Sequence, residues 1–126
     1  MNVLVVDDNE SVADSLAFLL DCYGHHAAVA YDGETALTLL RTGAFEITFL
    51  DENLPDIKGS AVARSLRETP NRSGAFLVSM TGDADSQEDI ARLFDVCLQK
   101  PFSCEALMHV IEDARCRSDA NTLRAA

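Results

Sequence analysis

The sequence has few basic side chains: 10 lysines and arginines stand against 21 aspartates and glutamates, which gives the 126-residue chain a formal net charge of −11. Because this charge repels nucleic-acid phosphates, we do not expect direct binding to DNA or RNA. No apolar run approaches the ~18 residues of a membrane span. The first apolar run is short and no basic segment precedes it, so no export signal is indicated. We therefore expect a cytoplasmic protein that makes no membrane contact.

The sequence also lacks the cysteine patterns of zinc and redox sites. Its four cysteines are Cys22, Cys97, Cys104 and Cys116. They show no Cys-x-x-Cys spacing, and no paired-histidine motif accompanies them. A chain of this length buries enough apolar surface to fold without disulfides, so we expect reduced thiols.

Short apolar runs alternate with helical patterns along the chain, without repeats or low-complexity segments. The runs predict strands at residues 3–6, 27–31, 47–50, 76–80 and 96–98. Apolar residues at helical spacing predict helices around residues 12–20, 36–40, 61–66, 90–94 and 107–114. Five strands alternating with five helices predict an α/β doubly wound parallel sheet with helices on both faces. We expect one domain over residues 1–117, with residues 118–126 as a helix end or flexible tail.

Polar residues stand at the carboxyl end of four of the five predicted strands. They are Asp7 and Asp8, Asp51, Thr81, and Lys100. Each has an ordinary alternative explanation as a helix cap, a turn residue or a solvated charge. In a parallel sheet, however, these ends share one edge, where open α/β sheets place their ligand sites. We therefore expect three carboxylates, a hydroxyl and an ammonium group in one pocket.

Such a pocket suits phosphoryl transfer. Three neighbouring carboxylates raise each other's pKa, and a divalent cation, Mg²⁺ or Mn²⁺, would offset their charge. Lys100 would pair with Asp51 or with an incoming anion, and Lys100 and Thr81 would hold phosphoryl oxygens. Asp51 is the expected nucleophile and would form an aspartyl phosphate.

The motifs in this order resemble the receiver domain of two-component response regulators, including the chemotaxis regulators. They are Val-Leu-Val-Val-Asp-Asp-Asn at 3–9, Leu-Asp-Glu-Asn-Leu-Pro-Asp-Ile-Lys-Gly at 50–59, Thr-Gly-Asp-Ala at 81–84 and Lys-Pro-Phe at 100–102. The resemblance covers roughly residues 2–114. It implies a flavodoxin-like fold with strand order 2-1-3-4-5.

The resemblance also implies the roles of the site residues. Asp51 would take a phosphoryl group from a histidine of a sensor kinase or a histidine phosphotransfer protein. Asp7, Asp8 and Asp51, with the backbone carbonyl of Asn53, would hold the metal. Thr81 and Lys100 would bind the phosphoryl group, and the domain would assist its own phosphorylation and dephosphorylation. The peptide bond before Pro101 is cis in the family.

The chain departs from the family pattern in two places. Cys97 stands where the family usually has an aromatic residue that moves with Thr81 during switching. We expect either an altered switch or a cysteine that simply fills the core. The interval from Thr81 to Lys100 is 19 residues, about one helical turn shorter than usual, so the fourth helix should be short.

Two further residues beside the site, Asn53 and Asp83, are expected to orient an attacking water and to shorten the life of the phosphoryl group.

We expect a phosphorylation-dependent switch that binds a downstream protein, as a monomer or weak homodimer, and not an enzyme acting on separate substrates. Only about ten residues follow the last predicted helix, and Met1 directly precedes the first strand, which favours a free-standing receiver. The alternatives are a receiver of a larger hybrid kinase, an Mg²⁺-dependent aspartyl phosphohydrolase, and a binding domain that has lost phosphorylation. The hydrolase is disfavoured because Asn53 stands where a general acid would be needed.

Overall fold

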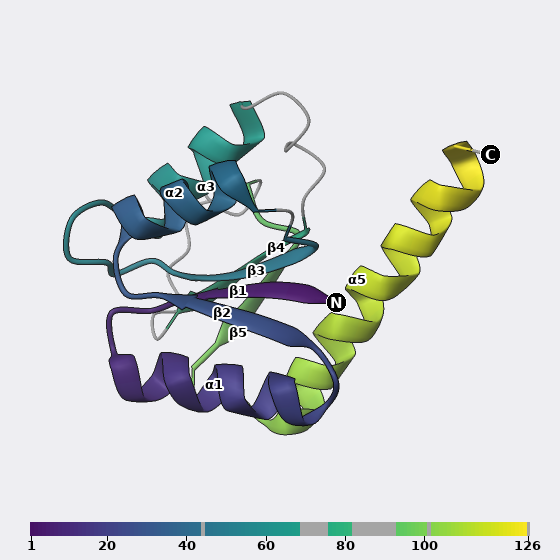
Figure 1. Ribbon diagram of the computed structural model, residues 1–126, viewed down its shortest axis with the longest axis horizontal. Helices are drawn as coiled ribbons and strands as arrows, with labels where there is room; N and C mark the ends of the chain where they lie inside the picture. The colour runs from purple at the N-terminus through teal and green to yellow at the C-terminus, as the bar shows by residue number, and fades with distance from the viewer. Residues whose placement is uncertain (44, 69–75, 82–92, 101, 126) are drawn as a thin grey trace.

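The computed structural model describes residues 1–43, 45–68, 76–81, 93–100 and 102–125. Five parallel strands form one sheet in the order β2-β1-β3-β4-β5, as predicted (Figure 1). The strands are β1 (Asn2–Val6), β2 (His26–Ala30), β3 (Ile47–Asp51), β4 (Phe76–Thr81) and β5 (Val96–Gln99). In register, Val5 of β1 lies between Val29 of β2 and Phe49 of β3.

Four helices lie within the described residues and cover both faces of the sheet (Figure 1). They are α1 (Glu10–Cys22), α2 (Gly33–Thr42), α3 (Gly59–Glu68) and α5 (Cys104–Ala125). In Figure 1, α1 and α5 lie on one side of the sheet and α2 and α3 on the other. The doubly wound architecture is therefore as predicted.

The predicted helix around residues 90–94 falls largely on residues 82–92, which lie outside the described part of the chain. Leu93 and Phe94, which the sequence pattern assigned to that helix, instead form the turn and the short connection before β5. Phe94 is buried in the core on the α2–α3 side, so its apolar character reflects packing and not a helical face.

The alternation of side chains along β1 and β3 divides the core into two layers. Val3 and Val5 pack with residues of α1 and α5 such as Leu16 and Leu107. The intervening Leu4 lies in the second layer, against α2 and α3. Because both faces of the inner strands are covered, their sequences are mostly apolar, and the polar Thr48 of β3 and Ser79 of β4 are buried with them.

Side chains and a glycine set the ends of two of the helices. The side chain of Asn9 accepts a hydrogen bond from the backbone N–H of Val12 and caps α1. Gly24 takes a φ of 87° just after that helix, a conformation that favours glycine. Ser103 caps α5 by accepting the N–H of Ala106.

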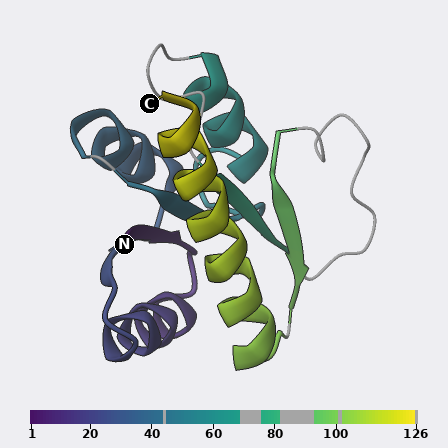
Figure 2. The ribbon, with the colours of Figure 1, turned by 90° about the vertical axis from the view of Figure 1, so that its right-hand side faces the viewer.

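Helix α5 is 22 residues long and continues to Ala125. Its last turns extend past the sheet, and Figure 2 views the molecule from the side of this helix. Among the described residues, no helix combines the length and the apolar character needed to cross a membrane.

Candidate metal centre

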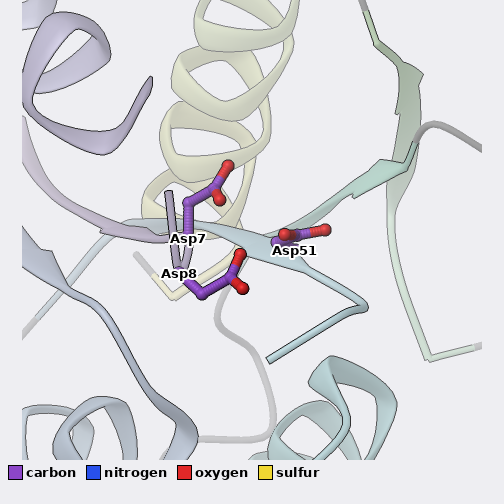
Figure 3. A group of neighbouring side chains, drawn as sticks. All are labelled: Asp7, Asp8 and Asp51. Atoms are coloured by element: carbon purple, nitrogen blue, oxygen red, sulfur yellow. The ribbon is translucent and has the colours of Figure 1, made fainter. Parts of the chain in front are cut away.

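Three carboxylates meet at the carboxyl edge of the sheet. Asp7 and Asp8 directly follow β1, and Asp51 is the last residue of β3. One oxygen from each lies within 4.8 Å of the others. Figure 3 shows the three side chains beside one another. The neighbouring positions of β1 and β3 in the sheet bring the acids together, although Asp8 and Asp51 are 43 positions apart in the sequence.

The backbone fixes Asp7 at this edge. Its N–H donates to the carbonyl of Ala30 at the end of β2 (3.1 Å), which extends the sheet pairing by one residue. Its side-chain Oδ1 accepts the N–H of Asn9 (3.0 Å). Asp7 is fully buried, whereas Asp8 is exposed. The site therefore has a rigid buried acid and an accessible one.

Lys100, which follows β5, reaches across β4 and β3 to the same acids. Its Nζ lies 2.6 Å from Asp7 Oδ2 and 3.7 Å from Asp51 Oδ2. The sequence suggested Asp51 or an incoming anion as the partner of Lys100, and the structure shows that its shorter contact is with Asp7. A charge-assisted bond of this kind is short and strong, so it anchors the ammonium group between the two acids.

The pKa of Asp51 is raised above the ordinary value of 3.8, chiefly because burial of the side chain disfavours the charged form. The negative charge of Asp7 raises it further. Lys100 and the backbone N–H of Asn53, 3.4 Å from Asp51 Oδ1, act in the opposite direction. Only 6 % of Asp51 is exposed. Without a cation the site therefore holds more negative charge than it readily tolerates.

The donor set fits Mg²⁺. Mg²⁺ prefers hard oxygen ligands, binds through a few carboxylates and keeps several waters. Asp7, Asp8 and Asp51 supply such oxygens, and the exposed Asp8 leaves one side of the group open to solvent. Among the described residues this is the one group of three potential metal ligands.

The sequence matches the family model of the response regulator receiver domain over residues 3–112. The chain belongs to the response regulator receiver domain family. Among curated proteins, this receiver is similar to the virulence sensor protein BvgS of Bordetella pertussis, with 33% identity over 94% of the chain and 10% of BvgS. It is also similar to the sensory transduction protein RegX3 of Mycolicibacterium smegmatis, with 33% identity over 85% of the chain and 47% of RegX3.

Solved receiver structures show the same fold. A CheY-like receiver domain from Methylobacillus flagellatus has a TM-score of 0.84 and 29% identity, over 90% of this chain and 98% of that one. The response regulator TrrA of Thermotoga maritima, solved in complex with Mg²⁺–BeF, has a TM-score of 0.82 and 25% identity, over 90% of this chain and 97% of TrrA. This chain spans about a tenth of BvgS and about half of RegX3.

The structure places the remaining predicted site residues of the receiver as follows. Asn53 is exposed in the loop after β3, two residues beyond Asp51. Thr81 ends β4 and pairs in register with Gln99 of β5, which puts its backbone at the same edge. The side chain of Thr81, Asp83 and the bond at Pro101 lie outside the described part of the chain. Cys97 is exposed on β5, so the expectation that it fills the core is wrong.

Two acids of the loop after β3 have structural contacts that the sequence did not indicate. Asp56 accepts the N–H groups of Gly33 (2.8 Å) and Glu34 (2.9 Å) at the start of α2. Glu52 accepts two hydrogen bonds from Ser60 at the start of α3. The first contact joins residues 23 apart in the sequence, and no local pattern reveals it. Together these contacts tie the loop that carries Asn53 to two helices.

Proposed function

We propose that this receiver accepts a phosphoryl group on Asp51 and signals by binding a protein partner in its phosphorylated form. The observation that carries the proposal is the meeting of Asp7, Asp8, Asp51 and Lys100 at one edge of the sheet. The charge of Lys100 and the open side of the acid group suit an incoming phosphoryl group, which bears negative charge on its oxygens.

The donor would be a phosphohistidine of a sensor kinase or a phosphotransfer protein. An oxygen of the Asp51 carboxylate attacks phosphorus, a P–O bond forms, and the P–N bond to the donor imidazole breaks with its electron pair going to nitrogen. Lys100, whose Nζ lies 3.7 Å from Asp51 Oδ2, would bind one of the transferred oxygens, and Thr81, at the end of β4, would donate a hydrogen bond to another. The reaction conserves the phosphoryl group and needs no oxidant or reductant.

Mg²⁺ held by Asp7, Asp8, Asp51 and the backbone carbonyl of Asn53 would supply positive charge between the carboxylate and the phosphoryl oxygens. Asp7 is buried and hydrogen-bonded, so it would hold its position during transfer. The side chain of Asn53 is exposed beside Asp51, and with Asp83 it would orient a water for hydrolysis of the acyl phosphate. A short-lived phosphoryl group is expected, and a half-life of many hours in Mg²⁺ buffer would contradict this.

A protein donor suits this site better than a small phosphate ester. The acids lie at an open edge beside a groove of about 710 Å³ that runs from Lys100 between α1 and the start of α5. The surface of the groove is largely apolar, and Leu16, Leu19 and Phe102 are among the residues that line it. The aspartyl phosphohydrolase alternative also requires an acid at position 53, where this chain has asparagine.

The homologues BvgS and RegX3 are both longer than this chain, so we propose the receiver chemistry for it either as a free-standing regulator or as one module of a hybrid kinase. The monomeric or weakly dimeric state and the cytoplasmic location stay predictions from the sequence.

The test is intact-mass spectrometry after incubation with Mg²⁺ and acetyl phosphate, for wild type and Asp51→Asn. We expect one added phosphoryl group on the wild type, none on the variant and none in EDTA. A folded wild type that is not labelled and does not bind Mg²⁺ would overturn the proposal. Steady release of inorganic phosphate from a phosphate ester such as p-nitrophenyl phosphate would favour the hydrolase.

A further inference from the structure

The residue after the proposed phosphoacceptor, Glu52, is bound to the start of helix α3 by both oxygens of its side chain. Oε2 accepts the backbone N–H of Ser60 at 2.9 Å, and Oε1 accepts the Ser60 hydroxyl at 2.8 Å. Ser60 is buried and Glu52 is partly buried. Hydrogen bonds to an ionised carboxylate are among the stronger ones in proteins, so this pair holds the two segments firmly.

The backbone at Glu52 is held at the same place. The N–H of Gly59 donates to the carbonyl of Glu52 (3.1 Å), and so does the N–H of Leu54 (3.3 Å). A Cβ at Gly59 would lie 2.3 Å from the carbonyl oxygen of Asp51. The peptide that joins Asp51 to Glu52 therefore rests directly on the first residue of α3.

This attachment lies next to two proposed metal ligands. The carboxylate of Asp51 precedes Glu52 in the chain, and the carbonyl of Asn53 follows it. The N–H of Asn53 reaches Asp51 Oδ1 only at 3.4 Å, and the Asn53 side chain is exposed. Mg²⁺ demands nearly ideal octahedral geometry, so a small rotation of the chain at residue 53 would displace one ligand.

We propose that Glu52 is a positioning residue for the metal and phosphorylation site, and that its bonds to Ser60 hold the Asn53 carbonyl in place for Mg²⁺. This inference rests on the proposed function of Asp51. A purely structural role is the competing explanation, because Ser60 supplies one of the first N–H groups of α3 and Glu52 acts as a cap for it. A cap changes the stability of the fold, whereas a positioning residue also changes metal affinity.

The variants Glu52→Ala, Glu52→Gln and Ser60→Ala separate the two roles. Glutamine has the length of glutamate and can keep hydrogen bonds to Ser60, so Glu52→Gln should retain Mg²⁺ binding within about 3-fold. Loss of the whole group in Glu52→Ala should weaken Mg²⁺ binding by about 10-fold, the range seen for groups that orient metal ligands. Ser60→Ala removes only the hydroxyl bond, and it should have a smaller effect that disappears in the Glu52→Ala background.

Arg67→Ala is the matched control. Arg67 lies near the end of α3 and joins Asp95 at 2.9 Å and the carbonyl of Leu93 at 3.1 Å, at the other end of the helix from Glu52. The Arg67→Ala substitution should lower the stability of the protein without changing its dissociation constant for Mg²⁺.

The experiment measures Mg²⁺ binding by calorimetry, urea unfolding, and the rate of labelling by acetyl phosphate at limiting Mg²⁺. The inference is supported if Glu52→Ala binds Mg²⁺ more weakly and is labelled more slowly than the wild type. Glu52→Gln should then show near-wild-type Mg²⁺ affinity and labelling, and Arg67→Ala should bind Mg²⁺ normally. Loss of stability in Glu52→Ala with wild-type Mg²⁺ affinity and labelling would overturn it and leave the proposed function intact. A wild type that neither binds Mg²⁺ nor is labelled would overturn both.

Discussion

Replacing Asp51 by asparagine should stabilise the protein in the absence of divalent cations. Coulomb's law at an effective dielectric constant of about 20 gives a repulsion of at least about 3.5 kcal/mol for two carboxylate oxygens that lie within 4.8 Å of each other. The attraction of Lys100, 3.7 Å from Asp51, is about 4.5 kcal/mol on the same scale and roughly offsets the repulsion from the buried Asp7. The screened repulsion from Asp8 and the burial of the Asp51 charge are not offset. We expect Asp51→Asn to raise the free energy of unfolding by about 1–2 kcal/mol.

The measurement is urea and thermal unfolding in EDTA at pH 7. For a domain of this size, the gain corresponds to a rise in Tm of roughly 3–6 °C per kcal/mol. Asp113→Asn is the control, because it removes the same unit of charge from an exposed position of α5 and should change little. Mg²⁺ should stabilise the wild type more than Asp51→Asn, since the variant lacks one carboxylate ligand.

The pH dependence has a definite sign. The folded-state pKa of Asp51 is raised, so ionised Asp51 destabilises the folded protein. This destabilisation is fully present above the folded-state pKa, and it is relieved as pH falls toward the unfolded value of 3.8. The difference in the free energy of unfolding between Asp51→Asn and the wild type should therefore become smaller as the pH is lowered. An Asp51→Asn variant that is no more stable than the wild type in EDTA would refute the reasoning.

Three other changes test the surroundings of the site. Thr48→Val should stabilise the fold by about 1 kcal/mol in urea unfolding, because the buried Thr48 hydroxyl has no hydrogen-bond partner among the described residues. A loss of stability in this variant would show that the hydroxyl does have a hydrogen-bond partner. Gly59→Ala should cost about 1–3 kcal/mol, since its Cβ meets the Asp51 carbonyl, and it should slow labelling with acetyl phosphate; normal stability and labelling would contradict the close packing. The N–H groups of Gly33 and Glu34 donate hydrogen bonds to Asp56 and lower the pKa of its carboxyl group. The wild type should therefore lose stability relative to Asp56→Asn as pH falls below 3.8. Parallel profiles of unfolding free energy against pH for the two proteins would argue against this contact.

Most of the fold could be predicted from local sequence because its inner strands β1, β3 and β4 are buried on both faces. Such strands are short and mostly apolar, and the polar residue that ends four of the five predicted runs marks the carboxyl edge of the sheet. The prediction for Phe94 was wrong because a buried apolar residue beside a strand has the same appearance in sequence as one on a helical face. Of the two alternatives for Cys97, the one in which it fills the core was wrong because β5 is an edge strand, and burial at an edge depends on what covers it.

The sequence by itself determined that Asp7, Asp8, Asp51 and Lys100 share one edge, because strand polarity and a parallel sheet leave no other place for them. The pairing of Lys100 with Asp7 depended on the tertiary fold, since the reach of a side chain across two strands, β4 and β3, cannot be read from spacing. The hydrogen bonds that Glu52 accepts from Ser60 and that Asp56 accepts from the start of α2 likewise form only when the loop packs against both helices. Strand ends follow from local pattern, whereas the contacts that orient them join segments that only folding brings together.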